Sequence, residues 1–224
     1  MKLKGFTLAE VLVVIMLLGV VATMTMPALM TNVQKQQAGP ALLRAISTLD
    51  NANAIFVTEH DVYGFMETCG ANYATLCFEP FIMNKLGAAR DNEAVTYNII
   101  EAPSETILNT EDEGVMAYTT KMGISYIFEP IAEESENGDE DVDRTVQRVF
   151  IDTNGLTKKP NTFGKDLFLT IMRLDDEGKI YPVGSKILGA PTWQEGNCDA
   201  TSIADPSTCA GSIVDNGGRV IYKW

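Results

Sequence analysis

Histidine and basic side chains are scarce in this sequence. His60 is the one histidine among 224 residues, and 17 lysines and arginines face 30 aspartates and glutamates. The sequence also lacks a G-x-S-x-G elbow, a P-loop and an H-E-x-x-H motif. Because covalent catalysis needs a nucleophile with a base, the chain is predicted not to be an enzyme. The net charge of −13, without any basic stripe, argues against nucleic-acid binding.

Charged side chains are missing from one long segment near the N-terminus. Residues 11–34 contain no ionisable side chain, and residues 11–22 form an apolar run. A helix of about 20 apolar residues can cross the hydrocarbon core of a bilayer, so we expect one membrane-spanning helix here. Lys2 and Lys4 precede the segment, and the positive-inside rule therefore places the N-terminus in the cytoplasm.

Three interpretations of this segment compete. A cleaved secretory signal peptide is disfavoured, because the apolar run is long and no A-x-A-like site follows it. A plain signal anchor accounts for the lysines and the hydrophobicity, but not for Glu10 in the first turn of the expected helix. A carboxylate within a transmembrane helix costs on the order of 2–3 kcal/mol. Glu10 is therefore expected to have a partner.

The third interpretation rests on residues 4–10, which read Lys-Gly-Phe-Thr-Leu-Ala-Glu. Together with the apolar run and Pro27, they resemble the cleavage and methylation signature of type IV prepilins and type II secretion pseudopilins. In that family a membrane-embedded aspartic peptidase cuts after the glycine and methylates the new amine. The resemblance implies cleavage between Gly5 and Phe6, and N-methylation of Phe6. It also implies that Glu10 pairs with the Phe6 amine of a neighbouring subunit.

The resemblance further implies a domain order and a set of partners. Residues 1–5 would be the leader peptide, 6–30 a transmembrane and filament-core helix, and 31–224 an exported globular domain. The expected protein is a structural subunit of a type IV pilus-like or type II secretion pseudopilus filament, periplasmic or at the cell surface. Its partners would be copies of itself, other pilin-like subunits, the prepilin peptidase and the inner-membrane assembly platform. A monomeric membrane-anchored protein that binds a cation or a basic partner is the alternative.

Beyond Pro27 a helical pattern resumes, with one face formed by Leu29, Val33, Leu42, Ile46, Leu49, Asn53 and Phe56. The pattern predicts one long helix over residues 6–58, kinked or locally melted at Gly39-Pro40. Its first half is apolar all round, and its second half is one-sided and needs a sheet to pack on. The expected fold class is α+β and pilin-like, with this helix packed on an antiparallel sheet of about four to six strands.

Six short β-branched or aromatic runs are predicted to be strands, namely residues 95–101, 115–119, 124–128, 146–151, 167–174 and 179–183. Between the last two, residues 175–178 are typical of a hairpin turn. Residues 78–86 are expected to form a short helix, 192–216 a turn-rich tail and 219–223 a final strand. Residues 129–143 carry many carboxylates and no basic residue, which favours a solvated loop.

Four cysteines lie in two close pairs, Cys69 with Cys77 and Cys198 with Cys209. Neither pair has the C-x-x-C spacing of a zinc or redox centre. An exported domain in an oxidising compartment would form two disulfides. Three pairings exist, and the two local ones are favoured because each closes a short loop. Reduced core thiols are the alternative.

A stretch after one predicted strand, Asp152-Thr153-Asn154-Gly155, places oxygen-bearing side chains at alternate positions before a glycine. Calcium is often wrapped in this way, and Asp152, Asn154 and Asp166 are its candidate ligands, with loop carbonyls completing the shell. The EF-hand pattern is not met, because the glycine comes too early and no glutamate ends the loop. The competing interpretation is a turn whose Asp and Asn side chains cap their own backbone. No other cofactor is expected.

Overall fold

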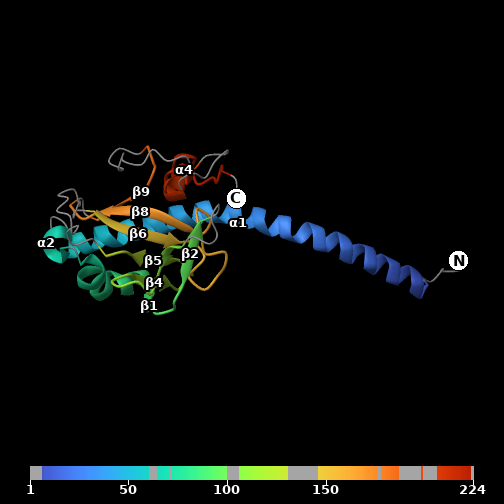
Figure 1. Cartoon of the computed structure of the whole chain (residues 1–224). Helices are drawn as coiled ribbons and strands as arrows, with labels where there is room; N and C mark the ends of the chain where they lie inside the picture. The colour runs from blue at the N-terminus through green and yellow to red at the C-terminus, as the bar shows by residue number, and fades with distance from the viewer. Residues whose placement is uncertain are drawn as a thin grey trace. The chain divides into compact units, whose positions relative to one another are not determined.

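The computed structural model describes residues 7–60, 65–70, 72–99, 106–130, 146–175, 178–186, 198 and 206–222 (Figure 1). The chain divides into two compact units, Met1–Gln37 and Ala38–Trp224. One helix of 53 residues, α1 (Leu8–His60), runs through both units. The long N-terminal helix that the sequence predicts is therefore confirmed.

The first unit contains the N-terminal part of α1. Its span Leu8–Met26 is long and apolar enough to cross a membrane, and its surface is not buried within the chain. The Thr23 hydroxyl donates to the Val20 carbonyl at 2.8 Å, and the Thr25 hydroxyl donates to the Val21 carbonyl at 3.0 Å. These polar groups are satisfied within the helix, as a lipid environment requires.

The helix continues without interruption through Pro27 and through Gly39-Pro40. Local melting, one of the two outcomes expected at Gly39-Pro40, therefore does not occur, and packing explains why. Gly39 is buried, and a Cβ at this position would collide with the carbonyl oxygen of Gly218. Gly218 has a φ of +83°, which residues with a side chain rarely adopt. Tertiary contact thus stabilises the helical backbone where proline removes one hydrogen bond.

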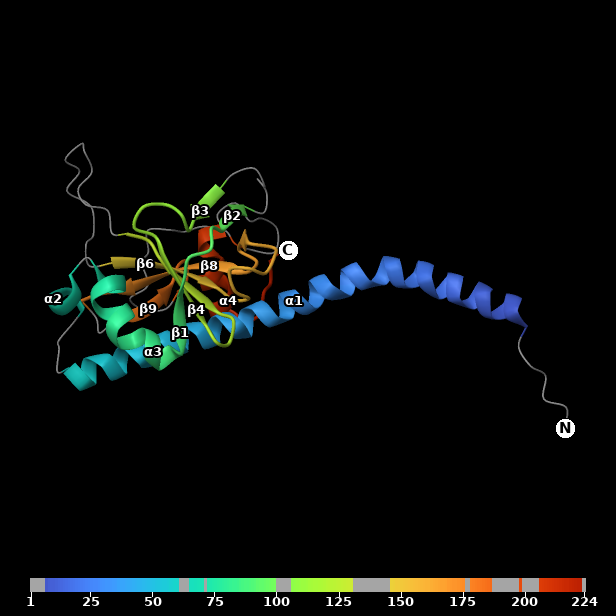
Figure 2. The same cartoon turned by 90° about the horizontal axis from the view of Figure 1, so that it is seen from below.

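Nine strands of the second unit form one sheet in the described part of the chain (Figures 1 and 2). They are β1 (Ala88–Asp91), β2 (Thr96–Ile99), β3 (Thr106–Asn109), β4 (Met116–Thr120), β5 (Ser125–Phe128), β6 (Val146–Asp152), β7 (Thr162–Phe163), β8 (Leu167–Arg173) and β9 (Lys179–Pro182). The order is β1-β4-β5-β6-β8-β7-β2-β3, and β9 pairs with β8. Only the pairs of β7 with β2 and with β8 are parallel among the described strands.

The second half of α1 packs on one face of this sheet. Its buried apolar residues recur at three- and four-residue steps, as an amphipathic helix requires, and include Leu42, Ala45, Leu49, Ala52 and Phe56. They share a core with sheet residues that include Tyr126, Phe128, Ile151, Phe168 and Met172. The expected α+β fold, with a one-sided helix on a mostly antiparallel sheet, is therefore confirmed.

The opposite face of the sheet is buried as well. A second core on this face includes Tyr97, Leu108, Ile127, Phe150, Leu169 and Tyr181. All four residues of β5 and all but the last of β8 are consequently buried. Strands that are covered on both faces have continuous apolar runs instead of alternating apolar and polar residues. These runs are the pattern from which the two strands were predicted.

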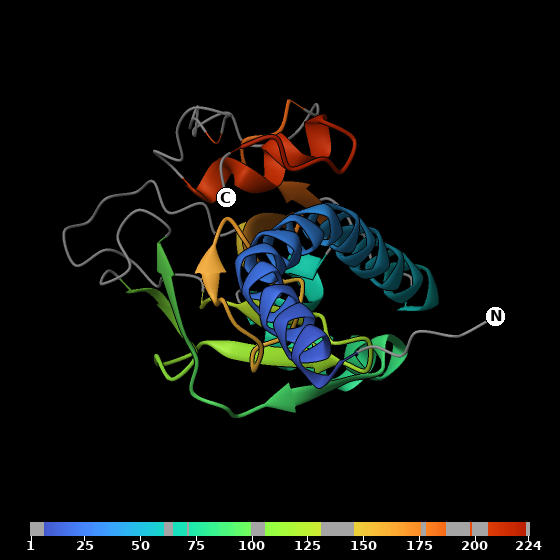
Figure 3. The same ribbon diagram turned by 90° about the vertical axis from the view of Figure 1, so that its right-hand side faces the viewer.

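Short helices complete the second unit. After α1 come α2 (Phe65–Cys69), the π-helix η1 (Ala74–Ile82) and α3 (Met83–Leu86), and Figure 2 shows η1 and α3 beside the last turns of α1. Near the C-terminus the 3-10 turn η2 (Pro206–Thr208) leads into α4 (Cys209–Asp215), which lies against β8 and β9 (Figure 3).

Two disulfides tie these helices to the chain. One joins Cys69 to Cys77, between α2 and η1, with the Cα atoms 5.8 Å apart. The other joins Cys198 to Cys209 at the start of α4, with the Cα atoms 4.9 Å apart. Both are the local pairings that the sequence favours, and they are of the kind found in exported domains.

The six predicted strands correspond to β2, β4, β5, β6, β8 and β9. The turn expected between β8 and β9 is closed by the Gly178 N–H, which donates to the Arg173 carbonyl at 3.1 Å. Strands β1, β3 and β7 were not expected, so the sheet is larger than four to six strands. They have only two to four residues each, and their pairing partners, not their local pattern, define them.

Three other expectations differ from the structure. The helix expected over residues 78–86 begins earlier, at Ala74. The tail expected to be turn-rich contains α4, because its apolar face, including Ile213, is buried against the sheet. Residues 219–222, expected as a final strand, form none; the Tyr222 hydroxyl instead donates to the Gly164 carbonyl at 2.6 Å. The acidic stretch 129–143 lies outside the described residues except for its first two.

Polar contacts fix the second half of α1 on the sheet. The Ile180 N–H of β9 donates to Asp50 Oδ1 at 2.7 Å, and the Tyr126 hydroxyl donates to the Ala45 carbonyl at 2.9 Å. Burial raises the pKa of Asp50 to about 6, although the Ile180 N–H and the charge of Lys179 act in the opposite direction. The charged form of this carboxyl is thus disfavoured by folding.

This environment predicts a pH-dependent effect of Asp50→Asn. A carboxyl whose pKa is raised on folding stabilises the folded state fully below about pH 4, and that contribution is lost as the pH rises through about 6. Asp50 is partly exposed, so solvent screens its charge. We therefore expect the free energy of unfolding of the variant, relative to that of the wild type, to be about 1 kcal/mol higher at pH 7 than at pH 4. Thermal unfolding of both chains in detergent at the two pH values measures this difference.

The matched control for this prediction is Asp112→Asn. Asp112 is an exposed aspartate on the same unit, so its replacement is expected to shift the unfolding temperature by the same small amount at both pH values. If the unfolding temperatures of wild type and Asp50→Asn differ by the same amount at pH 4 and at pH 7, the raised pKa of Asp50 is contradicted.

Candidate functional site

The first candidate site is the start of α1, where Thr7 and Glu10 bond to each other. Glu10 Oε2 accepts the backbone N–H and the hydroxyl of Thr7, both at 2.9 Å. The Glu10 N–H in turn donates to the Thr7 hydroxyl oxygen at 3.3 Å. This reciprocal arrangement is a capping box, in which a threonine and a glutamate three residues later satisfy backbone donors at the helix N-terminus.

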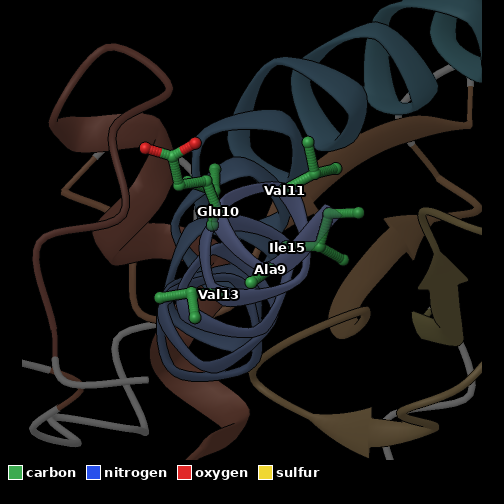
Figure 4. A pocket seen from close by; sticks show the side chains of 6 residues that line it. Ala9, Glu10, Val11, Val13 and Ile15 are labelled. Carbon is green, nitrogen blue, oxygen red and sulfur yellow. The ribbon is translucent and has the colours of Figure 1, made fainter. Parts of the chain in front are cut away.

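Within the single chain, the capping box and the helix dipole stabilise the Glu10 carboxylate. Its carboxylate lies at the positive end of the helix dipole, which favours a negative charge. Figure 4 shows the carboxylate directed outward from the helix, whose first turns also carry the apolar side chains of Ala9, Val11, Val13 and Ile15. No described residue donates to its second oxygen, Oε1. No basic side chain lies between Lys4 and Lys35 in the sequence either. Glu10 therefore has hydrogen-bond donors but no counter-charge among the described residues.

The surface around Glu10 is apolar on every side of the helix. The exposed residues of the first unit include Leu8, Leu12, Ile15, Met16, Leu17, Leu18, Val21, Met24, Met26, Leu29 and Met30. Leu29 and Val33 belong to the helical face predicted from the sequence, and both are exposed within the single chain. A soluble protein rarely exposes so large an apolar area, which marks this part of α1 as a membrane or protein contact surface.

The second candidate site is the loop between β6 and β8, where the structure brings Asp152, Asn154 and Asp166 together. Asp152 ends β6 opposite Leu167 of β8, so the register of the two strands places Asp166 beside it. The Thr153 N–H donates to the Asp166 carbonyl at 2.8 Å, and Asn154 Nδ2 donates to Asp166 Oδ2 at 3.3 Å. The three residues singled out in the sequence thus lie in one cluster.

Both carboxylates cap the loop backbone. Asp152 Oδ1 accepts the N–H groups of Asn154 and Gly155 at 2.9 and 2.8 Å. Asp166 Oδ2 accepts the N–H of Asn161 at 2.7 Å, and Oδ1 accepts that of Thr162 at 2.6 Å. The capped turn that the sequence offered as the competing interpretation is therefore present. It does not by itself exclude a ligand, because a carboxylate oxygen has more than one lone pair.

Two further members of the cluster were missed in the sequence. The Tyr97 hydroxyl of β2 donates to Asp152 Oδ2 at 2.6 Å, across a separation of 55 residues. Asn161 has a left-handed backbone with a φ of +52°, and its N–H reaches Asp166. No local pattern identifies Tyr97. An asparagine directly after a proline is a common turn signal, so Asn161 could have been found.

The two carboxylates are buried without an ionic partner. Asp152 and Asp166 are 0% and 3% exposed, and no ion pair between described residues includes either of them. Burial, and next the charge of Asp166, raises the pKa of Asp152 to about 6. Burial raises the pKa of Asp166 as well. The cluster therefore holds negative charge in a place where an unpaired charge is costly.

Two side-chain oxygens of the same cluster have no hydrogen-bond partner. They are Asn154 Oδ1 and Asn161 Oδ1, and both atoms are buried. Both unpaired acceptors of this cluster are therefore amide oxygens. The described residues contain no group of three or more His, Cys, Asp or Glu side chains that could hold a metal ion. A nitrogen- or sulfur-based metal centre therefore finds no support in the described part of the chain.

His60 packs against aromatic rings at the end of α1. Its ring stacks on Phe56 with centroids 4.3 Å apart and meets the edge of Phe81 at 4.9 Å. Its Nδ1 lies 3.0 Å from the Phe56 carbonyl oxygen. These contacts are those of a residue that packs the end of α1, and none of them joins the ring to a nucleophile.

Comparison with known proteins gives one match. Residues 1–26 match the family model described as the prokaryotic N-terminal methylation motif, the signature of type IV pilins and pseudopilins. The matched segment includes Gly5, Phe6 and Glu10, so the resemblance seen in the sequence is confirmed for this part of the chain. No curated protein and no solved structure matches the chain.

Proposed function

We propose that this protein is a structural subunit of a type IV pilus-like or type II secretion pseudopilus filament. The observation that carries the proposal is the match of residues 1–26 to the methylation motif, a segment in which Glu10 is followed by residues 11–34 without an ionisable side chain. In such a filament Glu10 pairs with the methylated Phe6 amine of the next subunit. Both charges are then neutralised in an apolar core, which removes the cost of a lone carboxylate.

Processing precedes assembly in this proposal. The prepilin peptidase removes residues 1–5 by cutting between Gly5 and Phe6, and it methylates Phe6. Residues 6–30 then form the membrane-spanning and filament-core helix, and residues 31–224 the exported globular domain. Copies of the chain, other pilin-like subunits and the inner-membrane assembly platform are its partners.

The surface of α1 supports assembly through this helix. Its apolar side chains are exposed around the whole circumference in the single chain, including Leu12, Met16 and Val20. Burying apolar area stabilises association by about 25 cal/mol per Å² when the area leaves water. Lipid tails weaken that gain, so close packing and the Glu10 pairing must supply more of the affinity.

The globular unit supports an extracytoplasmic location. Its two disulfides form and persist in oxidising compartments. Lys2 and Lys4 keep the N-terminus on the cytoplasmic side, so the remainder of the chain emerges on the other face of the membrane. The assembled filament is then periplasmic or at the cell surface. A structural role also agrees with the packing of His60.

The monomeric membrane-anchored binding protein is less well supported. An anchor needs the apolar helix but gives the Glu10 carboxylate no positive partner. It also gives no reason for a glycine, an aromatic residue and a glutamate at the spacing of Gly5, Phe6 and Glu10.

The mature N-terminus tests the proposal. When the chain is produced together with a prepilin peptidase, mass spectrometry is expected to find residues 6–224 carrying one N-methyl group on Phe6. Gly5→Val is expected to leave the chain uncut, since the peptidase cuts after this glycine. An intact Met1 in the wild type, or cleavage beyond Pro27, contradicts the proposed processing.

Gly19→Val is the matched control for Gly5→Val. It makes the same substitution within the matched segment, and a Cβ at Gly19 meets no atom within 4 Å. Its processing is therefore expected to equal that of the wild type.

A further inference from the structure

We propose that one end of the second unit docks on anionic phospholipid headgroups of the membrane that α1 spans. This surface, the basic end, consists of the exposed or half-buried side chains of Lys121, Met122, Lys158, Lys159, Lys165, Arg219 and Ile221. The inference rests on the membrane-spanning role that the proposed function gives α1, and it does not require filament assembly.

The C-terminal residues 218–222 form one side of the basic end. The first of them lies against Gly39, close to Ala38, where the second unit begins. The Tyr222 hydroxyl donates to the Gly164 carbonyl at 2.6 Å, which joins this segment to the loop between β6 and β8 (Figure 2). The basic end thus receives an arginine and an isoleucine from the C-terminal segment and a lysine from the loop.

The tip of the β4–β5 hairpin, residues 121–123, forms the other side of the basic end. A Cβ at Gly155 would lie 2.9 Å from the Gly123 carbonyl oxygen, so the hairpin tip touches the loop after β6. Lys158 Nζ lies beside the same tip, 3.7 Å from the position that a Cβ of Gly123 would take. The surface therefore continues from the C-terminal segment, across the loop, to the hairpin.

The positive charge of the basic end has no ionic partner in the described part of the chain. No ion pair between described residues includes its lysines or its arginine, whereas carboxylates pair with four basic residues elsewhere on the unit, namely Lys85, Arg90, Arg148 and Arg173. The net charge of the whole chain is −13. An exposed positive surface on such a protein attracts anions that the remainder of the molecule repels.

The carboxylates near the basic end are engaged by other groups. Asp152 and Asp166 of the same loop are buried and accept hydrogen bonds from backbone N–H groups. Asp215, at the end of α4, is exposed, and its two oxygens accept the Ser185 hydroxyl hydrogen and the Lys186 N–H. The lysines of the basic end therefore remain available for an external anion.

Two exposed apolar side chains lie among these charges. Met122 is 50% exposed and follows Lys121, and Ile221 is 44% exposed in the C-terminal segment. Protein surfaces in a membrane interface combine basic residues, which meet the headgroups, with apolar residues that enter the boundary of the acyl chains. A soluble anion would use the charges alone, so this combination favours a lipid surface as the partner.

The chain itself holds the basic end near the bilayer. The membrane-spanning segment ends at Met26, and the second unit begins at Ala38. The helical residues between them are about 16 Å long, at 1.5 Å per residue. The headgroup layer takes up about 5–8 Å of this length. The remainder is about one Debye length at 0.1 M salt. Each lysine or arginine at that range strengthens attraction to an anionic leaflet by about fivefold.

The test uses nanodiscs that each hold one full chain, so that no second subunit supplies the contact. A water-soluble acylating reagent labels exposed lysines, and mass spectrometry measures the rate at each site. With about one third phosphatidylglycerol in phosphatidylcholine, labelling of Lys121, Lys158 and Lys159 is expected to be about threefold slower than in phosphatidylcholine alone. Salt at about 0.5 M, where the Debye length is about 4 Å, is expected to abolish this protection.

Lys179 is the internal control for the labelling. It is exposed and lies opposite Arg173, at the end of β8 that is farthest from Leu167 and the basic end. Its labelling is therefore expected to be the same in both lipids. Equal slowing at Lys179, or equal labelling of the basic end in the two lipids, overturns the proposal. Inorganic phosphate that gives the same protection in phosphatidylcholine alone overturns the assignment to lipid.

A double variant tests whether the basic end acts as one surface. Lys158→Gln with Lys159→Gln is expected to reduce the lipid protection of Lys121 by at least half, and both positions are exposed, so the fold is retained. The matched control, Lys179→Gln, is expected to keep the full protection. Protection of Lys121 that survives the double variant, or that is lost in the control, overturns the assignment.

The same samples separate this inference from the proposed function. A chain that fails to enter the nanodiscs contradicts the membrane-spanning role of α1, and with it both proposals. An inserted chain without lipid protection overturns the docking alone and leaves the filament proposal intact.

Discussion

Replacement of Glu10 by alanine is expected to leave membrane insertion intact and to lower filament yield by about tenfold or more. Insertion depends on the apolar run, which the substitution lengthens. Assembly depends on the carboxylate, because without it the Phe6 amine of the neighbouring subunit is buried in an apolar core without a counter-charge. A tenfold loss corresponds to about 1.4 kcal/mol per subunit, less than the usual cost of an unpaired buried charge.

Glu10→Gln separates the charge from the capping box. A glutamine can still accept the N–H and hydroxyl hydrogens that Thr7 gives to Glu10 Oε2, but it has no charge. If the salt bridge between subunits carries assembly, glutamine and alanine reduce filament yield alike. If assembly depends instead on helix capping, only the alanine variant reduces filament yield, and the proposed pairing is contradicted.

Filaments sheared from cells and quantified against the membrane-bound pool give the measurement for both variants. Thr23→Ala serves as the control, since the Thr23 hydroxyl donates within its own helix, to the Val20 carbonyl. Its filament yield is expected to stay within about twofold of the wild type. Unchanged filament yield in Glu10→Ala would remove Glu10 from the assembly mechanism.

The elements that the sequence predicts are those whose signal is local. The one-sided pattern of α1 and the apolar runs of β5, β6 and β8 depend on residues within a few positions of each other, and these elements are found where expected. Strand β7 has two residues and exists because Phe163 pairs with Leu167 and Ile99. Such a strand is a product of tertiary pairing, and no window of the sequence contains it.

The loop between β6 and β8 shows the same limit at a site. The sequence groups Asp152, Asn154 and Asp166 because their types and spacing suggest oxygen ligands. It cannot supply Tyr97, which arrives from β2 and bonds to Asp152. Nor can it show that Asp152 and Asp166 are both buried, since burial depends on the strands that cover the loop. Composition can identify the chemistry of such a site, and the fold determines its charge balance.

Asn53 is a polar residue on the apolar face of α1, and the structure explains its presence. Its Nδ2 donates to the Gly178 carbonyl at 2.6 Å, and its Oδ1 accepts the Tyr73 hydroxyl hydrogen at 2.6 Å. Asn53 and Tyr73 are both 0% exposed. One amide thus joins α1, the β8–β9 turn and the segment before η1, far from water.

Asn53→Ala is expected to destabilise the globular unit by about 3 kcal/mol. The substitution removes three buried hydrogen bonds, including a weak one to the Met172 sulfur at 3.3 Å. It leaves the Tyr73 hydroxyl and the Gly178 carbonyl without this partner, each at a cost of about 1–3 kcal/mol. The unfolding temperature of the full chain in detergent should fall by about 6–12 °C. Asn51→Ala is the matched control, because Asn51 is exposed on the same helix and its replacement should change stability by less than about 0.5 kcal/mol.

A double variant distinguishes the stranded hydroxyl from a simple loss of packing. Tyr73→Phe removes the hydroxyl that Asn53→Ala leaves unpaired, so the two changes together should cost at least about 1 kcal/mol less than the sum of the single effects. Losses that add without coupling would show that Asn53 stabilises the unit through volume alone. Because Asn53 joins the second half of α1 to the β8–β9 turn, strong coupling would show that this helix is locked to its sheet by a buried polar contact and not by its apolar face alone.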